Sequence, residues 1–78
     1  MNRDWRAYGD ACRAERSRRR WSQAYIALLI GVSRTTITRI EGSLGGAASG
    51  ETLAALERLL PGLAKVGLLA DGKDTPDA

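Results

Sequence analysis

Two arginines and three threonines occupy residues 34–39, in the order Arg-Thr-Thr-Ile-Thr-Arg. If this segment is helical, its polar residues gather on one face: Arg34, Thr35, Thr38 and Arg39. Ile37 and Ile40 then lie on the opposite, buried face. Arginine can bond both major-groove acceptors of guanine, and threonine offers a hydroxyl group and a methyl group that fits the thymine methyl. We therefore predict that this face reads DNA bases. The alternative is a solvated face, which more often mixes lysine with glutamate.

Other kinds of chemistry lack the residues they need. The 78 residues include one cysteine and no histidine, which excludes an intramolecular disulfide, a Cys/His zinc site and histidine-based acid–base catalysis. Gly45 and Gly50 have the spacing of a phosphate-binding loop, but Glu51 stands where that loop needs lysine and would repel phosphate. We therefore expect no enzyme activity, no metal site and no cofactor.

The charge is unevenly distributed along the chain. Residues 1–40 hold nine arginines against three acids, whereas residues 41–78 hold three basic residues against six acids. A basic half is typical of proteins that bind a polyanion, although it can also simply solvate two helices. The longest apolar run, residues 24–32, is far shorter than the roughly 20 residues of a membrane span. With no secretory signal at the N-terminus, we expect a cytoplasmic protein.

Helical periodicity and capping residues predict an all-α fold of four or five helices, over residues 5–19, 23–30, 34–41, 51–60 and 61–69. The first helix carries an apolar stripe of Trp5, Tyr8 and Cys12. A chain of this length forms one small domain, which we place at residues 1–70. Residues 71–78 are polar and are predicted to be a disordered tail.

The second and third predicted helices are separated only by a Gly-Val-Ser turn. Asp4, Ser22 and Ser33 can cap the first three helices, and Gly31 can end the second in a left-handed conformation. Residues 43–50 are predicted to be a loop from their composition. Ala27 is small where the two helices must approach each other. Two short helices joined in this way form the helix-turn-helix unit, whose second helix enters the major groove of DNA.

The residues from Trp21 to Gly42 resemble the phage repressor/Cro-type helix-turn-helix family, also called XRE-type. The resemblance lies in the sequence Trp21-Ser-Gln-Ala-Tyr-Ile-Ala and in Gly31-Val-Ser-Arg-Thr-Thr-Ile-Thr-Arg-Ile-Glu41-Gly. It covers about residues 12–60 and implies a lambda-repressor-like fold and a homodimer on an operator. It also implies that Gln23 bonds a DNA phosphate, that Ser33 lies at the cap beside the DNA backbone, and that the polar face of residues 34–39 faces the bases.

The resemblance also assigns roles to the arginines before Trp21. Arg16 would pair with Glu41 as a structural ion pair. On this fold the next three arginines would face phosphates and add affinity without specificity: Arg18, Arg19 and Arg20. The alternatives are a solvated charge cluster and an arginine-rich RNA-binding helix flanked by Trp21.

Two features depart from the family pattern. Arg20 stands three residues before Gln23, where the family often has glycine, so a non-glycine residue must make the bend. The second helix is unusually apolar, with Tyr25, Leu28 and Leu29 at positions that are often polar. Either another helix covers these side chains or they form a surface for a protein partner.

We therefore expect a sequence-specific transcriptional regulator that occupies an inverted-repeat operator as a homodimer. The alternatives are an antitoxin-like protein that binds a toxin and regulates its own operon, and an RNA-binding protein. For the dimer contact we expect Leu63, Leu68 and Leu69, because one short helix cannot bury all three in its own core.

Overall fold

The structure is a computed structural model that describes residues 3–68. Four α-helices lie in the order α1 (Trp5–Arg18), α2 (Gln23–Ile30), α3 (Arg34–Arg39) and α4 (Gly50–Leu59). Three shorter turns of helix complete the described chain: η1 (Ile40–Leu44), η2 (Gly45–Ala47) and η3 (Pro61–Lys65). The all-α prediction is confirmed. The tail expected at residues 71–78 lies outside the described residues. Among the described residues, no helix combines the length and the apolar character that a membrane crossing requires.

Each α-helix begins at a side-chain cap. Asp4 accepts hydrogen bonds from the first backbone amides of α1, and Ser22, Ser33 and Ser49 do the same for the helices that follow them. Such a cap satisfies an amide that has no partner within its helix and stabilises the helix by roughly 1 kcal/mol. Because the cap is local, three of the four N-termini could be predicted from the sequence; the fourth, Ser49, lies in a segment expected to be a loop.

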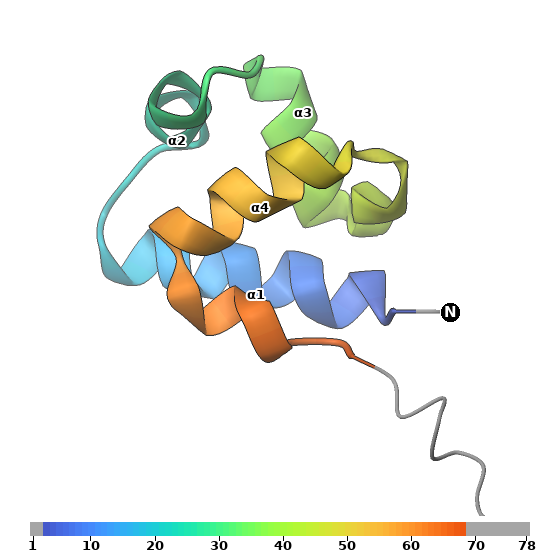
Figure 1. Cartoon of the computed structure of the whole chain (residues 1–78). Helices are drawn as coiled ribbons and strands as arrows, with labels where there is room; N and C mark the ends of the chain where they lie inside the picture. The colour runs from blue at the N-terminus through green and yellow to red at the C-terminus, as the bar shows by residue number, and fades with distance from the viewer. Residues whose placement is uncertain (1–2, 69–78) are drawn as a thin grey trace, which may run out of the picture.

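The tight turn between α2 and α3 also forms as predicted. Gly31 has φ 77° and ends α2 in the left-handed region, where glycine has no steric cost. The next amide, of Val32, donates to the carbonyl of Ala27 at 2.9 Å and fixes the direction of the chain. Figure 1 shows α2 and α3 at one end of the molecule, above α4 and α1.

The third helix stops where it was predicted to stop. Its α-helical hydrogen bonding ends at Arg39, where the wider turn η1 begins, but Ile40 keeps helical backbone angles and the chain first leaves them at Gly42 (φ -92°, ψ 20°). Ser43, with φ 75°, takes the left-handed conformation in place of Gly42. The wider turn keeps Ile40 and Glu41 buried and directed toward α1.

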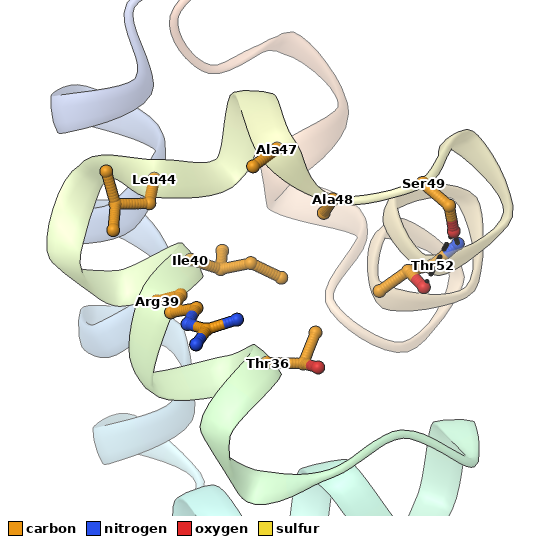
Figure 2. A pocket seen from close by; sticks show the side chains of 8 residues that line it. All are labelled: Thr36, Arg39, Ile40, Leu44, Ala47, Ala48, Ser49 and Thr52. Carbon is orange, nitrogen blue, oxygen red and sulfur yellow. Dashed lines mark hydrogen bonds between the residues drawn. The ribbon is translucent and has the colours of Figure 1, made fainter.

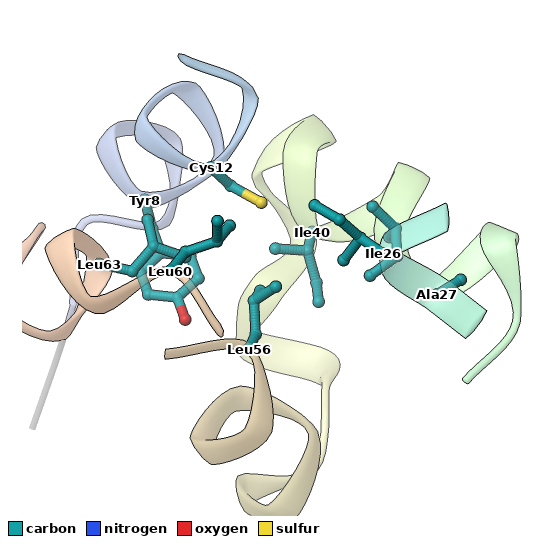
Figure 3. Packing of buried hydrophobic residues seen from close by; sticks show 9 residues of the cluster. Tyr8, Cys12, Ile26, Ala27, Ile40, Leu56, Leu60 and Leu63 are labelled. Atoms are coloured by element: carbon teal, nitrogen blue, oxygen red, sulfur yellow. The ribbon is translucent and has the colours of Figure 1, made fainter. Parts of the chain in front are cut away.

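One core joins all four helices (Figure 3). Its fully buried members are Tyr8 and Cys12 of α1, Ile26 and Ala27 of α2, Ile37 of α3, Ile40 of η1, Leu56 of α4, and Leu60 and Leu63. The helix predicted over residues 61–69 begins at Pro61 as expected but is shorter, because the turn of helix η3 ends at Lys65. Leu63 is part of the core, so it cannot form the dimer contact expected of it. Leu68 is exposed, and Leu69 lies outside the described residues.

The two ends of the described chain lie together. Arg3 donates from Nη2 to the carbonyl of Leu63 at 2.8 Å and from Nε to the carbonyl of Val66 at 2.9 Å. The amide of Asp4 donates to the carbonyl of Gly67 at 2.7 Å. These contacts close the domain beneath α1, at the end opposite α2 and α3 (Figure 1).

Candidate nucleic-acid interface

Helix α3 has two faces, as the helical wheel predicts. The side chains of one face are exposed: Arg34, Thr35, Thr38 and Arg39. Ile37 and Ile40 on the other face are buried, and Thr36, at the border between the two faces, is half-buried. Within residues 3–68, the side chains of Arg34 and Arg39 make no hydrogen bond and no ion pair with the protein. Two guanidinium groups without an acidic partner therefore lie at the two ends of the exposed face of α3.

A hollow of about 190 Å³ lies beside this face, between α3 and the start of α4 (Figure 2). It is lined by Thr36, Arg39, Ile40, Leu44, Ala47, Ala48, Ser49 and Thr52. Only Arg39 brings a charge into it, and its volume is below the roughly 300 Å³ at which cofactor sites begin. Among the described residues, no three acidic or cysteine side chains lie together as metal ligands. The chemistry of this surface is therefore that of its arginines and hydroxyl groups.

Ser33, predicted to lie against the DNA backbone, uses its hydroxyl within the protein. Its Oγ accepts from the amide of Thr36 at 3.3 Å and lies 3.2 Å from the Thr36 hydroxyl. This cap fixes the first turn of α3, next to Arg34. Ser33 is exposed as a residue, although its side chain acts as a cap and its carbonyl accepts from the amide of Thr36 at 3.0 Å.

A buried carboxylate lies directly behind the exposed face. Arg16 donates from Nε to Oε2 of Glu41 at 2.7 Å and from Nη2 to Oε1 at 3.0 Å. Gln23 donates from Nε2 to the same Oε1 at 3.0 Å. Burial alone would raise the pKa of Glu41, but the hydrogen bonds from Arg16 and Gln23 outweigh it and hold that pKa below its ordinary value. Glu41 therefore stays ionised and ties α1 and α2 to the end of α3.

Cys12 lies against the same carboxylate, with its Sγ 3.8 Å from Oε2 of Glu41. Burial, together with the negative charge of Glu41, raises the pKa of this thiol to about 12. A neutral, buried thiol is a poor nucleophile and a poor metal ligand. Cys12 therefore serves the core, as its position in the apolar stripe predicted.

Gln23 links this buried pair to the surface of α3. Its Oε1 accepts a hydrogen bond from the hydroxyl of Thr38 at 3.0 Å. One hydrogen of its amide group is used on Glu41 and the other has no partner among the described residues. Gln23 was predicted only as a phosphate contact, and the structure gives it a second position, between Thr38 and Glu41.

The arginine run before Trp21 is partly neutralised by a residue that the sequence analysis did not single out. Glu15 accepts from Nη2 of Arg18 and from Nη1 of Arg19, each at 2.6 Å. These hydrogen bonds, Arg19 first, hold the pKa of Glu15 below its ordinary value. The spacings of three and four residues along a helix could have indicated both pairs.

Arg20 has no such partner within the described residues. Its backbone takes φ 58°, so it makes the bend before α2 in the left-handed region, as expected for a residue standing in for glycine. Its side chain is exposed. Arg20 is therefore the uncompensated cation of the run, close to the start of α2.

The outer face of α2 is apolar and uncovered. The exposed fractions of Tyr25, Leu28 and Leu29 are 44%, 76% and 46%. The expectation that another helix covers them is wrong for residues 3–68. The ring of Tyr25 meets that of Trp21 edge to face, with the ring centres 5.5 Å apart, so this surface continues to the turn between α1 and α2.

Comparison with known proteins agrees with this arrangement. No curated protein and no solved structure matches the chain. The family model described as helix-turn-helix matches residues 13–62, from the middle of α1 through η3's first residues. This span holds the exposed face of α3, the turn before it and the buried pair behind it. The chain therefore belongs to the helix-turn-helix family of the XRE type, whose members are DNA-binding regulators.

Proposed function

We propose that this protein is a transcriptional repressor that occupies an inverted-repeat operator as a homodimer. The observation that carries the proposal is the exposed face of α3, where Arg34 and Arg39 lack any acidic partner in the described chain. Arginines on a face that only contacts solvent gain from carboxylates on that same face, and the described residues of this face include none. The protein acts without catalysis, in the cytoplasm, by blocking access to the DNA.

The residues divide into two sets by what they can contact. Four side chains face the bases: Arg34, Thr35, Thr38 and Arg39. Contacts to phosphates come from the turn before α2 and from the starts of α2 and α3: Arg18, Arg19, Arg20, Gln23 and Ser33. The position of the second set, before and after α2 and next to α3, supports this division. Gln23 uses one hydrogen of its side-chain NH₂ on Glu41, and the other is free among the described residues to bond a phosphate. Arginine contacts to phosphate add affinity to any sequence, whereas base contacts select one.

A homodimer on an inverted repeat places its two copies of α3 about one helical turn, roughly 34 Å, apart. Since Leu63 is inside the core, the dimer contact has to be made by other residues, of which Leu68 is exposed. Light scattering of the protein alone and on the operator tests the assembly. Two chains per duplex are expected, and one chain on every duplex would remove the homodimer from the proposal.

Selection of bound duplexes from a random DNA pool tests the function itself. We expect an inverted repeat to be enriched, with affinity that falls steeply with salt because phosphates release counterions. If 6–10 phosphates are contacted per dimer, affinity falls roughly 10³–10⁵-fold between 50 and 200 mM salt. A pool without any enriched sequence would overturn the proposal. Tight binding to RNA hairpins instead would assign the arginine run to RNA.

The uncovered face of α2 favours a second function, an antitoxin-like protein that binds a toxin while it regulates its operon. Leu28, at 76% exposure, lies on the same face of α2 as Tyr25 and Leu29, and such a surface usually belongs to an interface. Coexpression with the product of a neighbouring gene tests this. Leu28→Glu should abolish the complex and leave DNA selection unchanged. A complex that survives this change would place the partner elsewhere.

A further inference from the structure

The geometry points to Thr38 as a residue that reads thymine through its methyl group, with Gln23 as the positioning residue that takes up its hydroxyl hydrogen. This inference rests on the proposed function, because it needs α3 to lie in the major groove. Beyond that function, it names thymine as the base that Thr38 selects and Gln23 as the residue that positions Thr38.

The chain of hydrogen bonds starts at the buried carboxylate of Glu41. An ionised carboxylate only accepts hydrogen bonds, so the group of Gln23 that lies 3.0 Å from Oε1 must be its NH₂. The amide oxygen of Gln23 therefore points the other way, toward Thr38. An amide oxygen also only accepts, so the Thr38 hydroxyl must donate to it across 3.0 Å.

The hydroxyl of Thr38 has one hydrogen and two acceptors inside the protein. Besides Gln23 Oε1, the carbonyl oxygen of Arg34 lies 3.1 Å away. The hydrogen is therefore not available to the base acceptors in the major groove, which are the N7 atoms of the purines, guanine O6 and thymine O4. Both partners draw the oxygen toward the protein, and the methyl group is the part of this exposed side chain left to face the groove.

Thymine is the base that offers a methyl group in the major groove. Thr38 lies on the same face of α3 as Arg34 and Arg39, which suit guanine. The thymine should therefore lie in the same half-site as the guanines that these arginines read. A hydroxyl that was free to turn would instead accept or donate, and would tolerate several bases.

The test uses the duplex obtained by selection, with each thymine of a half-site replaced in turn by uracil, which differs by the missing methyl group. For the wild-type protein we expect one thymine in each half-site at which uracil lowers affinity about fourfold, the worth of one buried methyl group. Thr38→Val keeps a methyl group and should keep this loss. Thr38→Ser lacks the methyl group, so it should bind the thymine and uracil duplexes equally.

Gln23→Ala tests the positioning role. It removes one of the two acceptors of the Thr38 hydroxyl and leaves only the carbonyl of Arg34. Thr38 is then held less firmly, so the thymine–uracil difference should shrink toward that of Thr38→Ser, which a loss of stability alone would not cause. Lys65→Ala, on η3, changes no residue of the proposed interface and should keep the full difference. Thermal melts show whether each variant is folded.

Failure of this inference is distinct from failure of the proposed function. If no duplex is selected, the proposed function itself fails. If duplexes are selected but no thymine shows a uracil loss that depends on Thr38, the methyl reading is overturned. It is also overturned if Thr38→Val loses the discrimination and Thr38→Ser keeps it, because the hydroxyl then carries the contact.

Discussion

The guanidinium of Arg16 in α1 holds the carboxylate of Glu41, in η1 directly after α3, through two hydrogen bonds of 2.7 Å and 3.0 Å. Nη1 of Arg16 also donates to the carbonyl of Trp21 at 2.9 Å, in the turn before α2. One arginine therefore joins α1, the following turn and η1. The orientation of α3 depends on this pair, although neither residue faces the predicted DNA.

Loss of either partner should destabilise the domain. Glu41→Ala leaves Arg16 half-buried without its anion, and Arg16→Ala leaves the buried Glu41 with only the exposed Arg13, 3.7 Å away, as a cation. Each change should therefore lower the free energy of unfolding by about 3–5 kcal/mol. Urea denaturation measures this. Glu15→Ala is the control, since Glu15 also pairs with arginines but at the surface. If all three variants unfold at the same urea concentration, burial is not what makes the pair important.

The same pair predicts how stability depends on pH. The pKa of Glu41 is lower in the folded protein than its ordinary value of 4.5. Its contribution is therefore fully present above that ordinary value and is lost as the pH falls through the lower pKa of the folded state. Unfolding free energies measured from pH 7 down to pH 3 should fall more steeply for the wild type than for Glu41→Gln. Parallel curves would show that Glu41 does not titrate differently on folding.

The parts of the fold that depend on neighbours in sequence could be predicted. The caps Asp4, Ser22 and Ser33 and the left-handed Gly31 each act on the residues beside them, and all four have the predicted roles. The two faces of α3 follow from helix geometry alone. For the candidate site, the sequence predicted which side chains are exposed, but not that the hydroxyl of Thr38 is already bonded to Gln23.

The parts that depend on distant contacts could not be predicted. Leu63 is drawn into the core because η3 returns beneath α1, and the periodicity of residues 61–69 carries no trace of that path. Arg3 contacts carbonyls about 60 residues away, for which no local pattern exists. The left-handed residue after α3 is Ser43 instead of the adjacent Gly42, because the contact with α1 decides where the chain turns.

The close contact between α1 and η1 predicts that alanine substitutions at two glycines, Gly9 and Gly50, change stability in opposite directions. A Cβ atom added to Gly9 would lie 2.7 Å from the carbonyl oxygen of Ile40 and 2.8 Å from that of Glu41, both backbone atoms. Gly9→Ala should therefore lower stability by about 1–3 kcal/mol, despite the better helix propensity of alanine. At Gly50 a Cβ atom meets nothing within 4 Å, so Gly50→Ala should raise stability by about 0.4–1 kcal/mol. Thermal melts that rise for both variants would show that α1 and η1 are not in close contact.

The ion pairs of Glu15 predict that this acid restrains DNA binding. Glu15→Gln removes a negative charge from Arg18 and Arg19, so affinity for any duplex should rise and the salt dependence should steepen by up to about one counterion. Arg20→Ala should do the opposite and lower the salt slope by about one. Fluorescence anisotropy at several salt concentrations measures both. If Glu15→Gln leaves the slope unchanged, Arg18 and Arg19 do not reach phosphates.

Substitution of Arg34 is the most direct test of whether an arginine of α3 contacts a base or a phosphate. It is the first residue of α3, and the N-terminal end of a reading helix lies closest to the base edges. Arg34→Ala should cost about 1–3 kcal/mol on the selected duplex, and this loss should shrink on a duplex in which the contacted guanine is replaced. Arg20→Ala is the matched control, because it removes the same exposed group and should weaken every duplex equally. Equal losses on all duplexes for Arg34→Ala would reassign it to a phosphate.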